Sequence, residues 1–271
     1  MKKPGNKRQY KYVYPEFEGY NFYLFRIGGP GLGNLLPSWC RAQIESYNGT
    51  KLIHHSFNSF KLGPYLRGES QKRNYNFLRE KKSITGVKKL FLLIFRNKRI
   101  KKTNLKDFEY SEILPYKKQI KNSLVDLLNK QDQFLYNKIK PEICIHLRLG
   151  DFKNYSEGMK SNFRIDINWY VEVIKKLNQT YPNSKIYVFS DGLQNELSDI
   201  LKLKFVVNST SSNALLDILI MSNSKIFIGS ISSFSYWVTT LINNKSQVFL
   251  KKEFKEITKV SNFKNVFSWE D

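Results

Sequence analysis

The C-terminal half of this chain of 271 residues alternates short apolar runs with amphipathic stretches of helical length, starting just after Pro141. The apolar runs, each the length of a strand, occupy 143–149, 185–191, 204–208, 225–230 and 246–250. The stretches between them, with the apolar spacing of helices, occupy 167–180, 193–203, 212–224 and 232–243. Strands that alternate with helices in this way form βαβ units, so the pattern predicts a parallel sheet covered by helices.

The N-terminal part begins in the same manner and then loses its regularity. Its predicted elements are a strand at 21–29, a glycine-rich loop at 28–34, a helix at 36–47, a strand at 50–55 and a helical stretch at 107–139. Residues 67–106 are rich in Lys and Arg. We therefore expect two α/β domains, residues 1–140 with a basic helical insertion and residues 141–271 with a regular Rossmann-like pattern.

The charge of the chain predicts an anionic partner. The formal net charge is +22, because 45 Lys and Arg residues face 23 Asp and Glu residues. Nucleic acid, a membrane surface and a phosphorylated small molecule all fit such an excess. The sequence has no helix-turn-helix, zinc-finger or RNP-type aromatic pattern, so a nucleic-acid-binding protein is the weaker alternative and we expect no nucleic acid partner.

The cysteine and histidine residues favour a reducing compartment and no metal. Cys40 and Cys144 both lie in apolar runs and make no disulfide framework. His54, His55 and His146 do not have the spacing of metal ligands. The N-terminus does not resemble a signal peptide, and no apolar run is long enough to span a bilayer. We expect a cytoplasmic protein.

Polar residues gather where three of the predicted strands end. The clusters are His146, Arg148 and Asp151; Ser190 and Asp191; and residues 229–233. Ligands of open α/β sheets bind outside the carboxyl ends of the strands, so these clusters mark the expected site. Cys144, His146 and Arg148 share one face of the strand 143–149, because side chains alternate along a strand. We interpret this face as turned toward a ligand crevice rather than toward a core.

The third cluster has the chemistry of a phosphate site. A helix N-terminus offers unpaired N–H groups and the positive end of the helix dipole, and Ser232 and Ser233 add hydroxyl donors. The alternative is that Ser232 only caps the helix. Arg148, from another strand of the same sheet, supplies a planar guanidinium fork for diphosphate oxygens. Together these residues predict a diphosphate site.

The glycine-rich loop does not match a dinucleotide-binding fingerprint. Counted from Gly29, the pattern G-x-G-x-x-G needs glycine at position 34, where Asn34 stands. No acidic residue follows the strand predicted at 50–55, where one should hold a ribose. The loop is better explained by close approach of the backbone to a ligand.

Four segments resemble motifs of GDP-fucose-dependent fucosyltransferases, especially the α-1,2 enzymes of glycosyltransferase family 11. HLRLGDF at 146–152 is similar to their H-x-R-R-G-D-Y, and 215–243 is similar to their D-x-x-x-M-S block followed by N-S-S-F-S-W-W-G-A-W-L. GLGN at 31–34 resembles G-x-G-N-Q, and VFSD at 188–191 resembles a strand that ends in Ser/Asn-Asp. All four occur in the family's order.

The resemblance implies a GT-B fold, in which two Rossmann-like domains face a central cleft. Residues 141–271 would bind the nucleotide sugar, and residues 1–140 would lie on the acceptor side. The implied reaction is an inverting, metal-independent transfer of L-fucose from GDP-L-fucose to a glycan hydroxyl, in α-1,2 linkage. No cofactor is implied besides the donor. The acceptor would be an oligosaccharide or a lipid-linked glycan in surface polysaccharide or O-antigen synthesis.

The resemblance also implies roles for individual residues. Arg148 matches the arginine that holds the leaving diphosphate, and Asp217 matches an aspartate that accepts hydrogen bonds from guanine N1–H and N2–H. The donor-binding residues expected are Gly33, Asn34, His146, Ser190, Asp191, Asp217, Ser232, Ser233 and Phe234. The chain departs from the family pattern at Leu35, Leu149 and Tyr236. A transferase that uses a different nucleotide sugar is therefore the alternative.

The expected chemistry needs a stabilised leaving group and a base. Arg148 and the helix that begins near Ser232 are expected to stabilise charge on the leaving phosphate, where other glycosyltransferases place a metal ion. Asp151 is the first candidate for the base that takes the acceptor's proton, and Glu157 is the second. His146 could contact the diphosphate, order Asp151 or be purely structural.

Residues 84–102 place the apolar run LFLLIF between clusters of Lys and Arg. As a helix, this segment could lie on an anionic membrane surface. It could equally be an ordinary helix with a core face and a solvated basic face. Peripheral association with the inner face of the membrane is thus an alternative to a purely cytoplasmic location.

Overall fold

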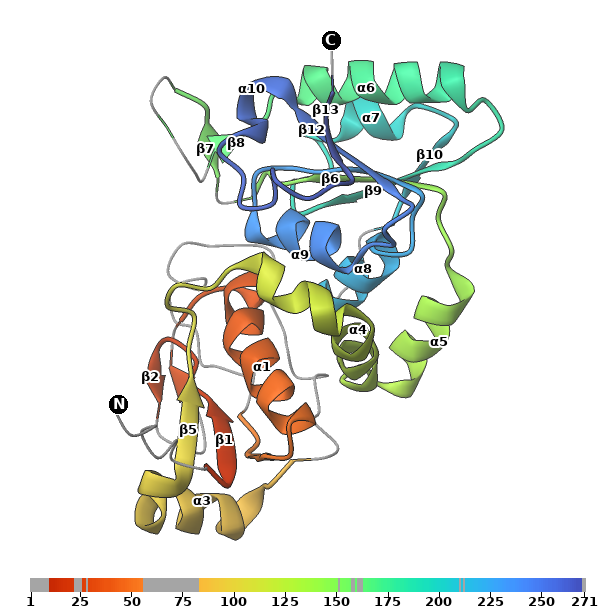
Figure 1. Ribbon diagram of the computed structural model, residues 1–271. Coiled ribbons are helices and arrows are strands. Elements are labelled where there is room, and N and C mark those ends of the chain that lie inside the picture. Colours follow the sequence, from red (N-terminus) through yellow and green to blue (C-terminus); the bar gives the residue numbers. More distant parts are fainter. Residues whose placement is uncertain are drawn as a thin grey trace, which may run out of the picture. The chain divides into compact units, whose positions relative to one another are not determined.

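The computed structural model in Figure 1 describes residues 10–21, 26–27, 29–55, 83–150, 152–156, 159, 163–209, 211 and 213–269. The chain forms two compact units, Met1–Phe108 and Glu109–Asp271. Each unit contains a parallel sheet with helices packed on it, so the predicted α/β class is confirmed. The expected cleft between two facing domains stays a prediction.

The N-terminal unit is built on a small parallel sheet. Its strand order is β4 (Lys51–Leu52), β1 (Tyr12–Pro15), β5 (Ile100–Thr103). Helix α1 (Leu32–Tyr47) packs on all three strands. The interface between helix and sheet is filled by buried Val13, Ala42 and Leu52, as expected for strands whose inner face packs on a helix.

The first strand of this sheet lies earlier than the sequence predicted. The prediction was one strand at 21–29, but the sheet strand is β1, whose residues Val13 and Tyr14 are almost fully buried. The described part of 21–29 instead contributes to a short antiparallel pair, β2 (Tyr20–Asn21) with β3 (Arg26–Ile27). Gly19 has φ 113°, a left-handed conformation that suits a turn between β1 and β2.

Helix α3 (Gly86–Phe95) is the basic helical insertion that the sequence predicted. Its buried residues Leu92 and Leu93 join Tyr14, Ile53 and Ile100 in a second small core. The 3-10 turn η1 (Asn97–Arg99) then connects α3 to β5. The insertion is therefore an integral part of the N-terminal unit.

The C-terminal unit contains a six-stranded sheet in which all neighbours run parallel. The strand order is β10 (Val206–Asn208), β9 (Ile186–Ser190), β6 (Ile143–Leu147), β11 (Ile226–Ile228), β12 (Gln247–Lys251), β13 (Val266–Trp269). Strand β6 is buried on both faces, as is usual for an inner strand of a parallel sheet. The chain builds outward from β6 through β9 and β10, then returns to the other side of β6 with β11. The switch point of the sheet thus lies between β6 and β11.

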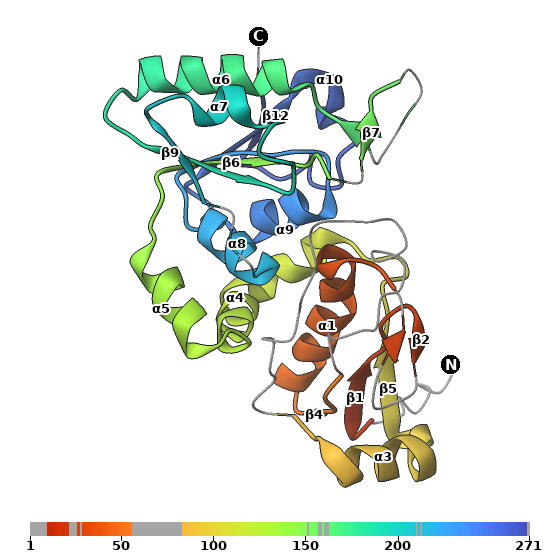
Figure 2. The same cartoon turned by 180° about the vertical axis from the view of Figure 1, so that it is seen from behind.

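Helices cover both faces of this sheet. Figures 1 and 2 show α6 (Ile167–Thr180) and α7 (Ser198–Leu201) on one face and α8 (Ala214–Met221) and α9 (Ser233–Leu241) on the other. The short helix α10 (Lys252–Lys255) follows β12. A separate parallel pair, β7 (Lys153–Asn154) with β8 (Phe163–Arg164), follows the exit of β6.

The units divide between Phe108 and Glu109, not at the expected position near residue 140. The stretch predicted to be helical at 107–139 forms η2 (Tyr110–Tyr116), α4 (Lys117–Asp126) and α5 (Lys130–Lys138). These elements pack on α8 and α9 of the C-terminal unit. Lys121 donates to the carbonyl oxygens of Ser222 and Leu241, at 3.0 and 3.5 Å, where α8 and α9 end. Packing, rather than the proline at 141, therefore sets the boundary.

Candidate functional site

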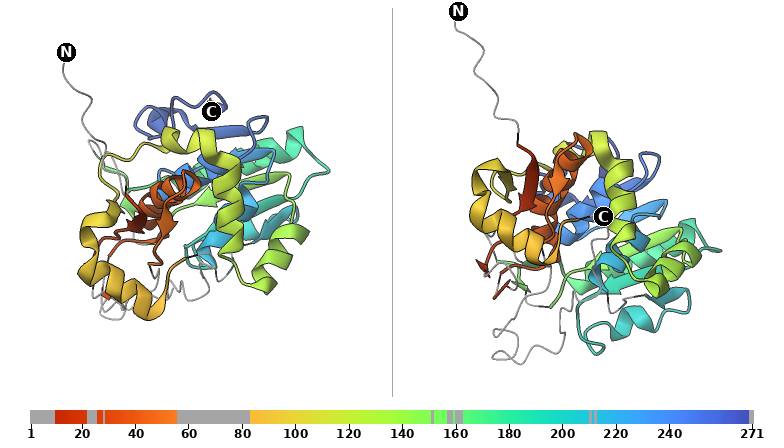
Figure 3. Two further views of the ribbon diagram at one scale, coloured as in Figure 1. Left: turned by 60° about the horizontal axis from the view of Figure 1, so that its bottom comes forward. Right: turned by 90° about the horizontal axis from the view of Figure 1, so that it is seen from below.

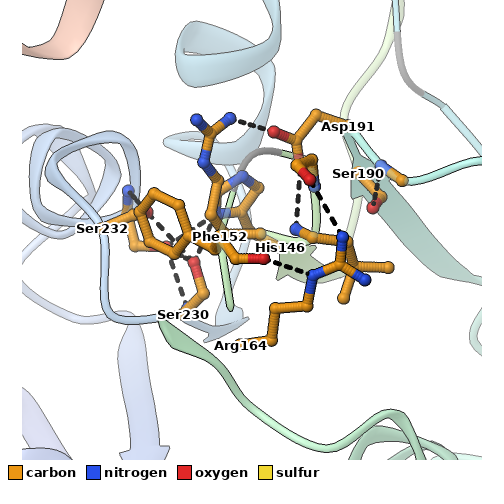
Figure 4. A network of polar contacts seen from close by, with 12 residues as sticks. His146, Phe152, Arg164, Ser190, Asp191, Ser230 and Ser232 are labelled. Atoms are coloured by element: carbon orange, nitrogen blue, oxygen red, sulfur yellow. Dashed lines mark hydrogen bonds and ion pairs between the residues drawn. The ribbon is translucent and has the colours of Figure 1, made fainter. Parts of the chain in front are cut away.

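The site begins where β6 and β11 end, on the two sides of the switch point. Arg148 follows β6 directly, and Ser230 and Ser232 follow β11 and lead into α9. His146 joins the two strand ends, because its Nδ1 lies 3.0 Å from Ser230 Oγ and 2.7 Å from Ser235 Oγ. Figure 4 shows His146, Ser230 and Ser232 in one network with Asp191 and Arg164. The structure thus brings His146 and Arg148 of the first predicted cluster to the same end of the sheet as the third cluster.

The guanidinium of Arg148 is held by Asp191. Arg148 Nη1 donates to Asp191 Oδ2, and the two side chains are only 17% and 18% exposed. The other oxygen of Asp191 accepts from the backbone N–H groups of Leu149 and Gly150, at 2.8 and 3.2 Å. Asp191 therefore fixes both the cation and the loop that carries it, so that Arg148 is oriented in advance.

Gly150 is required by this close approach. A Cβ built on Gly150 would collide with the Asp191 carboxylate. The glycine of the first motif therefore has a packing reason, because any side chain at Gly150 would push the carboxylate away from Arg148.

Arg164 holds the same loop from the opposite side, as the labelled side chains in Figure 4 show. It donates from Nη2 to the carbonyl of Gly150 at 2.9 Å and from Nε to that of Phe152 at 2.7 Å. Its Nη1 pairs with Glu196 Oε1 at 2.6 Å. The Phe152 ring lies 4.7 Å from the centre of the Arg148 guanidinium, within cation–π range. The sequence analysis missed Arg164, because nothing in its local pattern reveals a partner twelve residues earlier.

His146 is a buried structural residue of the site. It is 5% exposed, and its ring stacks on Phe234 with centroids 4.8 Å apart. Burial, and secondarily the nearby positive charge of Arg148, lower the pKa of His146 to about 3, so the ring is neutral at physiological pH. The expectation that the polar face of β6 turns toward a crevice is wrong for Cys144 and His146. They are buried because helices cover both faces of the sheet, and His146 contacts Ser235 and Phe234 of α9.

The N-terminus of α9 presents a ring of serine hydroxyls. Ser232 caps the helix, because its Oγ accepts from the backbone N–H of Ser235 at 3.2 Å. The same Oγ lies 3.1 Å from Ser230 Oγ. Ser233 and Phe234 are the first residues of α9 and are half-buried. Ser232 thus caps α9, and Ser233 is the hydroxyl that begins the helix itself. A phosphate-binding role for either residue stays a prediction.

Ser190 stabilises the turn at the end of β9. Its Oγ accepts from the backbone N–H of Gly192 at 3.0 Å. This bond shapes the turn that carries Asp191 toward Arg148. The second predicted cluster therefore acts through Asp191, with Ser190 supporting the turn.

Asp217 lies on α8 and is 5% exposed. Its Oδ1 accepts from the backbone N–H of Ser211 at 3.0 Å. Burial raises the pKa of Asp217 to about 7, the hydrogen bonds from Ser211 oppose this shift, and the charge of Asp132 adds to it. A buried carboxylate that titrates near neutrality is a functional candidate, not a solvated helix residue.

The cap of α8 connects this carboxylate to α5. Asn213 caps α8 by accepting from the N–H of Leu215 at 3.0 Å, and its Nδ2 donates to Asp132 Oδ2 at 2.8 Å. Asn129 donates to the same oxygen at 2.9 Å. The sequence analysis missed Asp132, because it lies 81 residues before Asn213 and outside every predicted motif.

The remaining predicted site residues lie elsewhere or outside the described residues. Gly33 and Asn34 lie in the first turn of α1 in the N-terminal unit, Gly33 buried and Asn34 exposed. The Asn34 N–H donates to the Gly31 carbonyl at 3.1 Å. Asp151 and Glu157, the candidate bases, lie outside the described residues.

Two properties bear on the predictions about metals and membranes. Within the part of the chain that the structure describes, no three His, Cys, Asp or Glu side chains are grouped so that they could hold a metal ion. The helices of the same part are all too short or too polar to cross a bilayer.

Comparison with known proteins gives a family and several distant relatives. Residues 65–269 match the family described as "Glycosyl transferase family 11". An alpha-1,2-colitosyltransferase of Escherichia coli is 31% identical over 108 residues, which cover 37% of this chain and 36% of that protein.

Two solved structures cover most of the chain at very low identity. The fucosyltransferase NodZ from Bradyrhizobium, co-crystallized with GDP, is 10% identical, with coverage of 86% of this chain and 93% of NodZ and a TM-score of 0.43. POFUT1 in complex with GDP-fucose is 11% identical, with coverage of 87% and 95% and a TM-score of 0.43.

Proposed function

The chain belongs to glycosyl transferase family 11, and on this premise we propose that it moves L-fucose from GDP-L-fucose to a glycan hydroxyl. The observation that carries the proposal is the pairing of Arg148 with Asp191 beside the N-terminus of α9. A partly buried guanidinium and a helix N-terminus at the end of a parallel sheet are suited to a diphosphate.

The reaction is proposed to proceed with inversion. The acceptor oxygen attacks the anomeric carbon from the face opposite GDP, the bond between this carbon and the β-phosphate oxygen breaks, and GDP leaves with the electron pair. Arg148 and the N–H groups at the start of α9 stabilise the negative charge that grows on the β-phosphate. The acceptor hydroxyl proton passes to a carboxylate, for which Asp151 is the first candidate and Glu157 the second.

Asp217 supplies the proposed selectivity for guanine. When ionised, its carboxylate accepts from two adjacent donors, and guanine offers N1–H and N2–H side by side. Adenine and uracil lack this pair. The bond network through Asn213 to Asp132 keeps the start of α8 in place, so these residues position Asp217 without reaching the base themselves.

Ligand-induced thermal shift tests the donor class. GDP should raise the melting temperature, by the mass-action stabilisation that any native-state ligand confers, while UDP and ADP at equal concentration should not. Asp217→Asn should reduce the GDP shift, and Phe134→Ser, a change of an exposed residue on α5, should keep it. A shift with UDP or ADP larger than that with GDP would contradict the donor assignment.

A transfer assay with and without EDTA then tests the chemistry. Purified protein should release GDP from GDP-fucose in the presence of an acceptor glycan, and EDTA should leave the rate unchanged. Activity that is lost in EDTA and restored by Mn²⁺ would contradict the metal-independent scheme.

The second candidate function is transfer from another nucleotide sugar. It is supported by the 31% identical relative, which is a colitosyltransferase. A donor screen separates the two candidates, because a colitose donor would be consumed faster than GDP-fucose in that case.

A further inference from the structure

Helix α3 of the N-terminal unit is apolar on both of its sides. Its inner side places Leu92 and Leu93 in the core with Tyr14 and Ile100. Its outer side carries four strongly exposed apolar residues: Val87 (82%), Phe91 (49%), Ile94 (57%) and Phe95 (69%). Their spacing of four, three and one positions places them on one face of the helix. An ordinary surface helix has polar residues there, so this face is built to meet something other than water.

Within the N-terminal unit, no described element covers this outer face. In Figures 1 and 3, α3, coloured ochre, lies against the strands of its own unit on one side, and no described helix or strand of the same unit lies on its other side. The rings of Phe91 and Phe95 contact each other at 5.2 Å between centroids, so they form one continuous apolar surface.

Positive charge surrounds this surface. Residues 83–106 contain eight Lys and Arg residues and no Asp or Glu. Lys101 and Lys102 are paired with Glu45 and Glu16. The exposed cations beside the apolar face, which make no ion pair in the described part of the chain, are Lys88, Arg96, Lys98 and Arg99.

We propose that the outer face of α3 docks on an anionic lipid bilayer. The four apolar side chains enter the boundary between head groups and acyl chains, and Lys88, Arg96, Lys98 and Arg99 contact lipid phosphates. This pairing of an exposed apolar stripe with an unopposed basic rim is the signature of a peripheral membrane helix. The inference goes beyond the proposed transfer reaction and does not depend on it.

Charge favours a bilayer over the two other candidates for covering this face, a second copy of the chain and another segment of the same chain. A second copy of the chain would bring two basic rims together, and like charges across an interface oppose association. Residues 56–82 of the same chain carry seven Lys and Arg residues against two Glu residues, so covering the face with them would add further repulsion. An anionic lipid surface neutralises the rim and accepts the apolar residues at the same time.

Vesicle flotation with the full-length chain tests the proposal. The protein should float with phosphatidylcholine vesicles that contain phosphatidylglycerol, and should not float with phosphatidylcholine alone. Val87→Ser with Phe95→Ser should weaken binding about tenfold or more, because two of the most exposed apolar side chains are lost. Lys98→Glu with Arg99→Glu should also weaken it at least tenfold, since each basic residue near the surface is worth about fivefold.

Matched controls separate specific docking from general adhesion of a basic protein. Phe134→Ser changes an equally exposed aromatic residue of α5, and Lys185→Glu with Lys204→Glu reverses two exposed charges of the C-terminal unit. Both controls should bind vesicles within about twofold of wild type. Circular dichroism and thermal unfolding should show that all variants fold alike.

Four outcomes would overturn the proposal. The first is that wild type does not float with anionic vesicles. The second is that the α3 variants and the controls bind equally, which would indicate general electrostatic adhesion. The third is a dimer of wild type that Val87→Ser with Phe95→Ser converts to a monomer, which would assign the face to a second copy. The fourth is that an acidic protein, and not lipid, protects the backbone amides of α3 around Phe95 from hydrogen exchange, which would assign the face to a protein partner.

Discussion

Replacing Arg148 by alanine should reduce transfer far more than removal of one hydrogen bond would suggest. The change removes the cation proposed to stabilise the leaving phosphate, and loss of one such donor typically lowers kcat by about 10²–10³-fold. It also leaves the carboxylate of Asp191 without its partner in a place where it is only 18% exposed. Two unit charges about 4 Å apart at an effective dielectric constant near 20 interact by about 4 kcal/mol, so this carboxylate would repel the diphosphate.

The second change, Asp191→Asn in the Arg148→Ala background, should restore part of the activity. Asparagine keeps an oxygen that can accept from the N–H groups of Leu149 and Gly150, so the loop is retained while the negative charge is removed. Solvent and loop relaxation reduce the ideal repulsion, and we expect a recovery of roughly tenfold in kcat/KM. Asp191→Asn alone should lose less activity than Arg148→Ala, because its arginine is still present.

The assay is the initial rate of GDP release from GDP-fucose in the presence of acceptor, for wild type and the three variants. Thermal unfolding of each variant controls for loss of structure. The reasoning is refuted if Arg148→Ala transfers sugar at a rate near that of wild type. It is also refuted if the double variant is slower than Arg148→Ala, since the carboxylate would then help the reaction without its partner.

Four further predictions concern single residues of the site. The pKa of His146 is lowered from 6.5 to about 3, so the unfolded chain binds its proton more readily, and stability should fall as pH falls from 6.5 toward 3; denaturant titrations of wild type should show this slope and those of His146→Asn a flatter one. The pKa of Asp217 is raised to about 7, so calorimetry should show GDP affinity that rises more steeply between about pH 6 and about pH 8 in wild type than in Asp217→Asn, where only the ionisation of the GDP phosphate remains. Ser232→Ala should lower the free energy of unfolding by about 1 kcal/mol through loss of the cap, visible in urea titration. Ser233→Ala should leave unfolding within about 0.5 kcal/mol of wild type but weaken GDP binding about threefold to tenfold, and an effect on unfolding alone would count against its phosphate role.

The parts of the fold that could be predicted from the sequence are those encoded by local periodicity. The alternation after Pro141 predicted five strands of the C-terminal sheet, because the length and spacing of apolar runs depend only on neighbouring residues. The same reasoning failed in the N-terminal unit, because the longer apolar run at 21–29 was predicted as the sheet strand instead of the shorter segment Tyr12–Pro15. Burial of Val13 and Tyr14 by packing, not the length of the run, decides which segment joins the sheet.

The candidate site shows the same limit. Arg148 and the serines before α9 could be found, because strand ends and helix starts can be read along the chain. Asp132 and Arg164 could not, because each acts through side-chain bonds to residues distant in sequence. The state of His146 also required the structure, since its neutral form follows from burial against Ser235 and Phe234 of α9, which lie far along the chain.

The early boundary between the two units has a practical consequence for expression of fragments. A truncated clone that starts at Pro141 would omit α4 and α5. It would lose Lys121, which donates to the last carbonyls of α8 and α9, and Asp132, which accepts from Asn213. Such a fragment should be recovered insoluble or without nucleotide affinity. A clone that starts at Glu109 retains these supports and is the better choice for growing crystals with nucleotide.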